Sequence, residues 1–242
     1  MNRNELQACK DGYIYIHDQS ARLDTMNCCL FDVGSVLRGG FEMGNVWYNE
    51  PKTLDTAFDV MGDIILSTAA QQYGGFTVPE VDKILAPYAQ KSYNKYYEEF
   101  LKYSDPSWEG REEKGRVYAW EKVCRDCDQG WQGIEYKLNT VGSSRGDYPF
   151  VTVTLGLGTG RFEKMISKSL LKVHMGGQGK AGHKKPVLFP KIVFLYDEEI
   201  HGDGKECEDV FETGVACSAK TMYPDWLSMS GQGYISSNVQ KY

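Results

Sequence analysis

Seven cysteines are spread along the 242 residues, and the one in the most distinctive setting is Cys217. It stands between the small residues Ala216 and Ser218, which leave its thiol unshielded. Pro224 follows closely and disfavours helical backbone at Tyr223, so the chain must turn there. A thiol at such a turn can be presented to a cavity, although a free cysteine is more often a small buried side chain. The local sequence leaves both interpretations open.

Cys28 and Cys29 form a vicinal pair in the sequence Asn-Cys-Cys-Leu-Phe. In an extended segment, successive side chains point to opposite faces of the sheet. At most one of these two thiols can therefore face a given cavity.

Cys124 and Cys127 form a C-x-x-C pair, a spacing found in zinc sites and in redox dithiols. A zinc site needs further ligands, and His201 with Cys207 is only a loose candidate for them. The alternative is two thiols on neighbouring faces of one helix. We expect no metal in this chain, and the role of the pair stays open.

The composition narrows the class of protein. Hydrophobic residues make up 41% of the sequence and aromatic residues 13%, which is enough for a sizeable core. The net charge of −6 excludes an overall basic surface of the kind that binds nucleic acid. The sequence has no run of about 18 apolar residues, so it predicts no membrane span. The first residues also lack the apolar core of a signal peptide. Seven cysteines without such a signal favour a reducing compartment, so we expect a cytoplasmic protein, and the odd count leaves at least one thiol free.

The hydrophobic pattern predicts alternating helices and strands, and therefore an α/β domain with a largely parallel sheet. Alternating Tyr and Ile predict a strand over 11–18, with His17 at its end. His17 either faces a substrate or is hydrogen-bonded to a neighbour. The other predicted elements are helices over 53–72, 79–103, 117–138 and 161–173, strands over 150–155 and 191–196, and a helix from about 206 that carries Cys217 near its end.

Two glycine-rich segments lack the spacing of phosphate-binding loops. Residues 156–160 do not match G-x-G-x-x-G, and residues 176–180 do not match the P-loop pattern. Residues 174–185 are instead expected to form a basic loop, which either attracts phosphate groups or is a solvated surface.

An ordered series of short motifs runs through nearly the whole chain. They are GYIYIHD (12–18), NC (27–28), GFEMGN (40–45), QYGG (72–75), LNT (138–140), SS (143–144), PF (149–150), FPK (189–191), AC (216–217) and MYPD (222–225). In this order the set resembles the anaerobic (class III) ribonucleoside-triphosphate reductases, which are glycyl radical enzymes.

The resemblance implies a ten-stranded α/β barrel made of two half-sheets of parallel strands, with this chain as the N-terminal half. It implies that residues 214–225 form a finger loop inside the barrel, with Cys217 as the thiyl radical that abstracts the ribose 3′-hydrogen. Cys28 matches the thiol on an early strand that reduces the substrate radical from the other side. Loss of the 2′-hydroxyl as water needs a proton donor and a reductant, and a thiol can provide both.

The resemblance also implies a substrate site lined by polar side chains. His17 and Tyr15 would line the nucleotide site, although many relatives carry histidine where Tyr15 stands. The remaining candidates are Asn139, Ser143 and Ser144, in a strand-edge loop that would hold ribose hydroxyls or phosphates, and Asn238 in the tail, where the local match is poor.

In the family, the paired helices that correspond to residues 53–103 form a dimer interface that binds a deoxynucleotide effector. The resemblance therefore implies a homodimer with dNTP or ATP effectors. Relatives also carry an ATP-cone domain, a zinc site and a glycyl radical segment, none of which has a match here. We expect the glycyl radical to come from a segment supplied in cis or trans, installed by a radical-SAM activase, and the chain alone to be inactive. The electron donor, formate or a protein dithiol, stays open.

Two alternatives remain. One is another glycyl radical enzyme that acts on a formate-, diol- or choline-type substrate, which Cys28 disfavours because such enzymes need no reducing thiol on the opposite strand. The other is a non-catalytic nucleotide-binding and dimerisation module that keeps the effector site and the helices.

Overall fold

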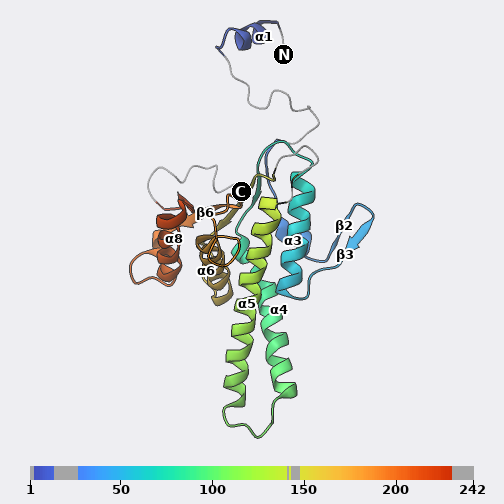
Figure 1. Cartoon of the computed structure of the whole chain (residues 1–242), viewed down its shortest axis with the longest axis vertical. Helices are drawn as coiled ribbons and strands as arrows, with labels where there is room; N and C mark the ends of the chain where they lie inside the picture. Colours follow the sequence, from blue (N-terminus) through green and yellow to red (C-terminus); the bar gives the residue numbers. More distant parts are fainter. Residues whose placement is uncertain (1–2, 14–26, 141, 143–147, 231–242) are drawn as a thin grey trace.

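A computed structural model describes residues 3–13, 27–140, 142 and 148–230 (Figure 1). Its main sheet has five strands, all parallel, in the order β1-β4-β5-β6-β7. This confirms the predicted α/β class with a parallel sheet. The strands are β1 Cys29–Leu30, β4 Phe76–Val78, β5 Val151–Leu155, β6 Lys191–Tyr196 and β7 Asp225–Ser228.

Helices make up most of the remaining described chain. The long helices α4 and α5 form a hairpin that extends away from the sheet (Figure 1). Helix α5 begins at Arg111, six residues before the predicted 117. The helices are α1 Arg3–Lys10, α2 Val33–Leu37, α3 Leu54–Ala69, α4 Val81–Tyr103, α5 Arg111–Thr140, α6 Arg161–Gly176, α7 Glu198–His201 and α8 Glu208–Thr221, and a separate hairpin joins β2 Phe41–Met43 to β3 Val46–Tyr48.

The register of the parallel strands gives the sheet two unlike faces. Val78, Val153 and Ile192 lie side by side and are at most 1% exposed. One position earlier on their strands, Thr152 and Lys191 lie side by side on the other face and are partly exposed. Helix α3 contacts β4, and helix α4 contacts β5. We call the buried side the helix-covered face and the other side the open face.

Close packing of the helices explains why a glycine stands in the middle of α5. Gly130 of α5 lies against Phe58 of α3, and a Cβ at this glycine would lie 2.1 Å from the phenyl ring. The same ring meets Trp131 edge-on, with centroids 5.0 Å apart. The helical layer therefore requires a residue without a side chain at position 130.

The glycine-rich segment after β5 is held by a buried carboxylate. Asp82 in the first turn of α4 is 0% exposed and accepts hydrogen bonds from the backbone N–H of Gly156 at 3.1 Å and of Gly158 at 3.2 Å. It also accepts one from Ser167 Oγ at 3.2 Å. Burial raises the pKa of Asp82, and these hydrogen bonds oppose the rise. Two of the N–H groups that a phosphate-binding loop would present, those of Gly156 and Gly158, are thus already bound to Asp82.

We predict that Asp82→Ala lowers the free energy of unfolding by about 3 kcal/mol, because two backbone N–H groups and one hydroxyl lose a buried acceptor. Asp82→Asn keeps one oxygen acceptor and should cost only about 1 kcal/mol. Urea denaturation measures both, and Asp203→Ala, a change at an exposed carboxylate, is the matched control. Equal stabilities of Asp82→Ala and the control would contradict the structural role of Asp82.

Candidate functional site

Cys28 lies immediately before β1 and is exposed. Its Sγ accepts a hydrogen bond from the backbone N–H of Gly75 at 3.2 Å. The space for the thiol depends on the glycine pair before β4, since a Cβ at Gly74 would lie 2.4 Å from this sulfur. Two glycines distant in sequence from Cys28 therefore make room for its thiol.

Cys29 points the other way. It pairs in register with Phe76, which is 0% exposed on the helix-covered face, and its Sγ donates a hydrogen bond to Gln72 Oε1 at 3.1 Å. Burial raises the pKa of the Cys29 thiol. Because side chains alternate along an extended segment, Cys28 points to the open face. The structure thus agrees with the expectation that the two thiols face opposite sides.

The surroundings of Cys28 on the open face combine aromatic rings with a cation. Phe150 lies immediately before β5. Its carbonyl oxygen accepts a hydrogen bond from the backbone N–H of Phe76 in β4 at 2.8 Å, and its side chain is 50% exposed. The ring of Phe189 meets that of Phe150 edge-on with centroids 5.4 Å apart. Lys191 Nζ lies 5.5 Å from the centroid of the Phe150 ring. We call Cys28, Phe150, Phe189 and Lys191 the Cys28 surface.

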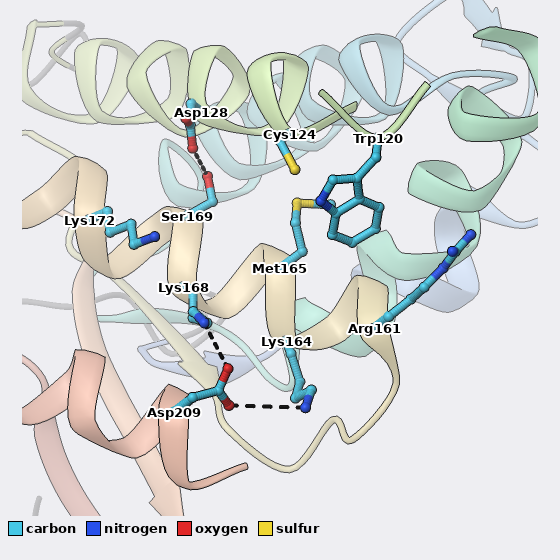
Figure 2. Close-up of a pocket in the computed structure, with 10 residues that line it drawn as sticks. All are labelled: Trp120, Cys124, Asp128, Arg161, Lys164, Met165, Lys168, Ser169, Lys172 and Asp209. Carbon is cyan, nitrogen blue, oxygen red and sulfur yellow. Dashed lines mark hydrogen bonds and ion pairs between the residues drawn. The ribbon is translucent and has the colours of Figure 1, made fainter. Parts of the chain in front are cut away.

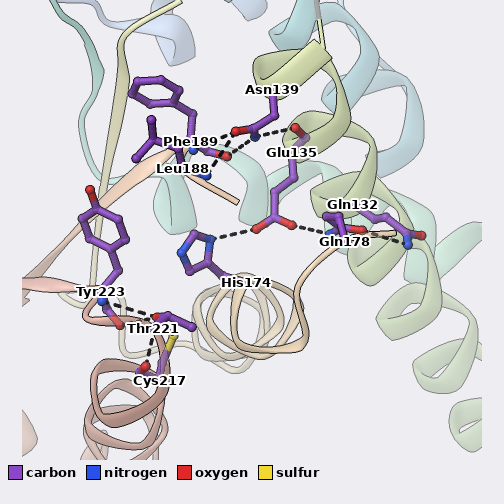
Figure 3. Close-up of polar contacts among 10 residues, drawn as sticks. All are labelled: Gln132, Glu135, Asn139, His174, Gln178, Leu188, Phe189, Cys217, Thr221 and Tyr223. Atoms are coloured by element: carbon purple, nitrogen blue, oxygen red, sulfur yellow. Dashed lines mark hydrogen bonds and ion pairs between the residues drawn. The ribbon is translucent and has the colours of Figure 1, made fainter. Parts of the chain in front are cut away.

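Asn139 supports this surface, in a way that differs from its predicted role. It lies in the last turn of α5, so the prediction of a strand-edge loop is wrong for this residue. Its side-chain N–H groups donate to the carbonyl oxygens of Phe189 at 2.6 Å and Glu135 at 2.7 Å. Its Oδ1 accepts the backbone N–H groups of Leu188 and Phe189, each at 3.1 Å (Figure 3). A side-chain amide has two donors and two lone pairs, so none is left for a ribose hydroxyl.

A buried polar cluster beside Asn139 was not predicted from the sequence (Figure 3). Glu135 is 0% exposed, and its Oε1 lies 2.9 Å from Nδ1 of His174, which is 1% exposed. The side-chain amide of Gln178 donates to Glu135 Oε2, and that of Gln132 donates to Gln178 Oε1 at 3.2 Å. The prediction of an exposed basic loop is therefore wrong for His174, which lies in α6. Helical spacing could have indicated that Glu135 is buried, because Glu135 lies four residues after the buried Trp131, on the apolar face of α5.

Cys217 lies in helix α8 and is 0% exposed. The predicted finger loop over 214–225 is wrong for 214–221, because these residues are helical and the helix ends at Met222 with φ 67°. The Sγ of Cys217 lies 3.6 Å from Thr221 Oγ1, and burial raises the pKa of the thiol. One turn earlier, Gly214 packs on Trp226 and Phe194. Since Phe194 belongs to the helix-covered face, α8 and its thiol lie on that face.

The structure does not bring Cys28 and Cys217 together. Cys28 precedes one edge strand, β1, and α8 precedes the other edge strand, β7. Four strand spacings separate these edges, on the order of 20 Å, and the two thiols are also on opposite faces of the sheet. The other predicted site residues, Tyr15, His17, Ser143, Ser144 and Asn238, lie outside the described residues.

The C-x-x-C pair lies on α5. Cys127 is buried and Cys124 half-buried, and burial raises the pKa of both thiols. Within the described ranges, no group of three or more His, Cys, Asp or Glu side chains is arranged to hold a metal ion. None of the described helices is long and apolar enough to cross a membrane.

Sequence comparison gives the same family along almost the whole chain. The family model described as anaerobic ribonucleoside-triphosphate reductase matches residues 1–241. The reductase of that name from Enterobacteria phage T4 is 35% identical over 237 residues, which cover 96% of this chain and 38% of the phage protein. The Escherichia coli protein of the same name is 35% identical over 229 residues, which cover 93% of this chain and 31% of that protein. The chain thus spans about a third of the length of these relatives.

Solved structures agree on the fold. The anaerobic ribonucleotide reductase of Thermotoga maritima with dATP in the specificity site superimposes with a TM-score of 0.68 at 14% identity, over 97% of this chain and 39% of that one. Its complex with dATP and CTP gives a TM-score of 0.66 at 14% identity, over 96% and 38% of the two chains. The five parallel strands and their helical layer are therefore one part of a glycyl radical enzyme barrel, and the chain belongs to the anaerobic ribonucleoside-triphosphate reductase family.

Proposed function

We propose that this chain forms one half of the catalytic barrel of an enzyme that reduces ribonucleoside triphosphates to deoxyribonucleotides, with Cys28 as the thiol that reduces the substrate. The observation that carries the proposal is the placement of Cys28, the one exposed cysteine among those described, on the open face of the sheet. The rest of the barrel would close over this face and enclose the ribose between the two halves.

The Cys28 surface fits this chemistry. The exposed Cys28 thiol can donate its one hydrogen atom to a substrate radical and become a thiyl itself. The proton for the departing 2′-hydroxyl and the electrons that restore the thiol would come from the electron donor, formate or a protein dithiol. Phe150 and Phe189 place apolar rings beside Lys191, which offers a positive charge for a substrate phosphate. The glycyl radical, in a segment supplied in cis or trans and installed by a radical-SAM activase, would provide the unpaired electron.

The structure of this chain does not identify the thiol that abstracts the ribose hydrogen. Cys217 is buried on the helix-covered face, so its position gives no support to the role that the sequence resemblance implies. All seven cysteines lie in the described residues, so we infer that the thiol which faces Cys28 across the ribose is contributed by a segment outside this sequence.

We predict that Cys28→Ala abolishes ribonucleotide reduction in a complex reconstituted with the glycyl radical segment and the activase, while nucleotide binding stays unchanged. Cys217→Ala is the matched control: it should keep most of the activity and lose about 1–2 kcal/mol of stability, as expected for a small buried side chain. Product formation from a ribonucleoside triphosphate measures the first effect, and urea denaturation the second.

If Cys217→Ala is folded but inactive, the radical role implied by the sequence is correct and our placement is wrong. If Cys28→Ala stays active, the proposed function fails. A chain that binds nucleotide but gives no product in any reconstituted complex would favour the non-catalytic module instead.

We further propose that a cavity of about 620 Å³ beside α2 and α4 binds a deoxynucleotide effector, as dATP is bound in the specificity site of the Thermotoga maritima enzyme. Lys91 lies over the Tyr88 ring at 4.8 Å and pairs with Glu50 at 2.5 Å. Arg38 is exposed and has no ion pair among the described residues, so its guanidinium is available to a phosphate. The cavity overlaps the segment 53–103, through which we also propose homodimerisation.

We predict that Arg38→Ala weakens dATP binding about tenfold, the loss of one charge-assisted hydrogen bond. Equilibrium titration of the protein with dATP measures the effect. Lys205→Ala, which removes an exposed cation outside the cavity, should leave the affinity unchanged. Equal affinities of the two variants would exclude this cavity as the effector site.

A further inference from the structure

A second cavity, of about 380 Å³, lies between α5, α6 and α8 (Figure 2). Its walls come from these three helices and not from the open face of the sheet. It is therefore separate from the Cys28 surface, and it shares no lining residue with the proposed effector cavity beside α2 and α4. The proposed function assigns it no role.

Helix α6 lines this cavity with four cations: Arg161, Lys164, Lys168 and Lys172. Their spacing of three, four and four residues places them on one side of the helix. Successive lysines lie one helical turn apart, about 6 Å along the axis. The helix thus presents a row of positive charge along the length of the cavity.

The carboxylates in the cavity neutralise only part of this charge. Asp209 of α8 accepts Lys168 Nζ at 2.7 Å and lies 4.0 Å from Lys164 Nζ. Asp128 of α5 accepts the hydroxyl of Ser169 (Figure 2). No ion pair forms with Lys172 or with Arg161 within the described ranges. The cavity therefore has an excess of positive charge and two cations without a carboxylate partner.

Three other residues that line the cavity are apolar or aromatic. Trp120, Met165 and Cys124 face the cavity (Figure 2). The Arg161 guanidinium lies 5.4 Å from the centroid of the Trp120 ring and 4.4 Å from that of Tyr93, so aromatic rings hold this cation in place. Such a combination of an apolar wall with a few convergent charges is typical of small-molecule sites.

We propose that this cavity binds an organic polyphosphate, with its phosphate groups along Lys164, Lys168 and Lys172 and its flat apolar part against Trp120 and Met165. Lysine ammonium groups bind phosphate as point charges, and the row of three matches a chain of phosphates better than a single carboxylate. Lys168 then exchanges its pair with Asp209 for a phosphate oxygen, while Lys172 gains a partner that it lacks in the free protein.

Calorimetric titration of the protein with inorganic triphosphate and with ATP tests the site. Lys172→Ala removes an exposed cation without breaking an ion pair, so the variant should fold normally and bind inorganic triphosphate about tenfold more weakly. The matched control is Lys102→Ala, an exposed lysine at the end of α4, which should bind within about twofold of the parent. Affinity should also fall as ionic strength rises.

Comparing the affinities for inorganic triphosphate and ATP distinguishes the contribution of the lysine row from that of the apolar residues. ATP should bind more tightly than inorganic triphosphate, and Trp120→Ala should remove that advantage while leaving triphosphate binding unchanged. Arg38→Ala, which changes the effector cavity, should leave triphosphate binding at this site intact. Equal triphosphate affinities of Lys172→Ala and Lys102→Ala, or no measurable binding of either probe, would overturn the proposal.

Discussion

The alternation of side chains across a parallel sheet is the constraint on which the rest of this structure depends. Because β1 is fixed in register with β4 at Cys29 and Phe76, Cys29 must point into the helical layer and Cys28 must point away from it. A shift of one residue would bury Cys28 and expose Cys29. The same alternation places Phe194 under α8, and with it Cys217. The separation of the two thiols thus follows from strand register and not from loop conformation.

Buried polar groups hold this register at both ends of the strands. Asp82 takes up the N–H groups of the glycine-rich segment after β5, and Asn139 binds the backbone just before β6. Glu135 and His174 tie α5 to α6 next to Asn139. Each of these side chains is hydrogen-bonded to the protein, so they stabilise the scaffold and leave the chemistry to the exposed groups of the Cys28 surface.

Much of the fold could be predicted from the sequence because its elements have strong periodic patterns. The strand over 191–196 and the helices near 54–69 and 81–103 appear close to their predicted bounds, and the opposite orientations of Cys28 and Cys29 needed only the period of a strand. The radical role of Cys217 came from the family resemblance, while helical spacing indicates that Cys217 and His174 are buried. Cys217 follows Val210 and Gly214 by seven and three residues on the buried side of α8, and His174 follows the buried Leu170 by four in α6. Asn139 could not be assigned from sequence at all, since its partners are backbone groups about 50 positions away.

Cys28 is presented on the open face of the sheet, while Cys217 is enclosed on the other face. Timed alkylation of the native protein with iodoacetamide, read by mass spectrometry of the two cysteine-containing peptides, tests it directly. The structure predicts that Cys28 is modified in the native state and that Cys217 is modified only once urea unfolds the protein. Modification of Cys217 in the native protein at a rate equal to that of Cys28 would contradict the account.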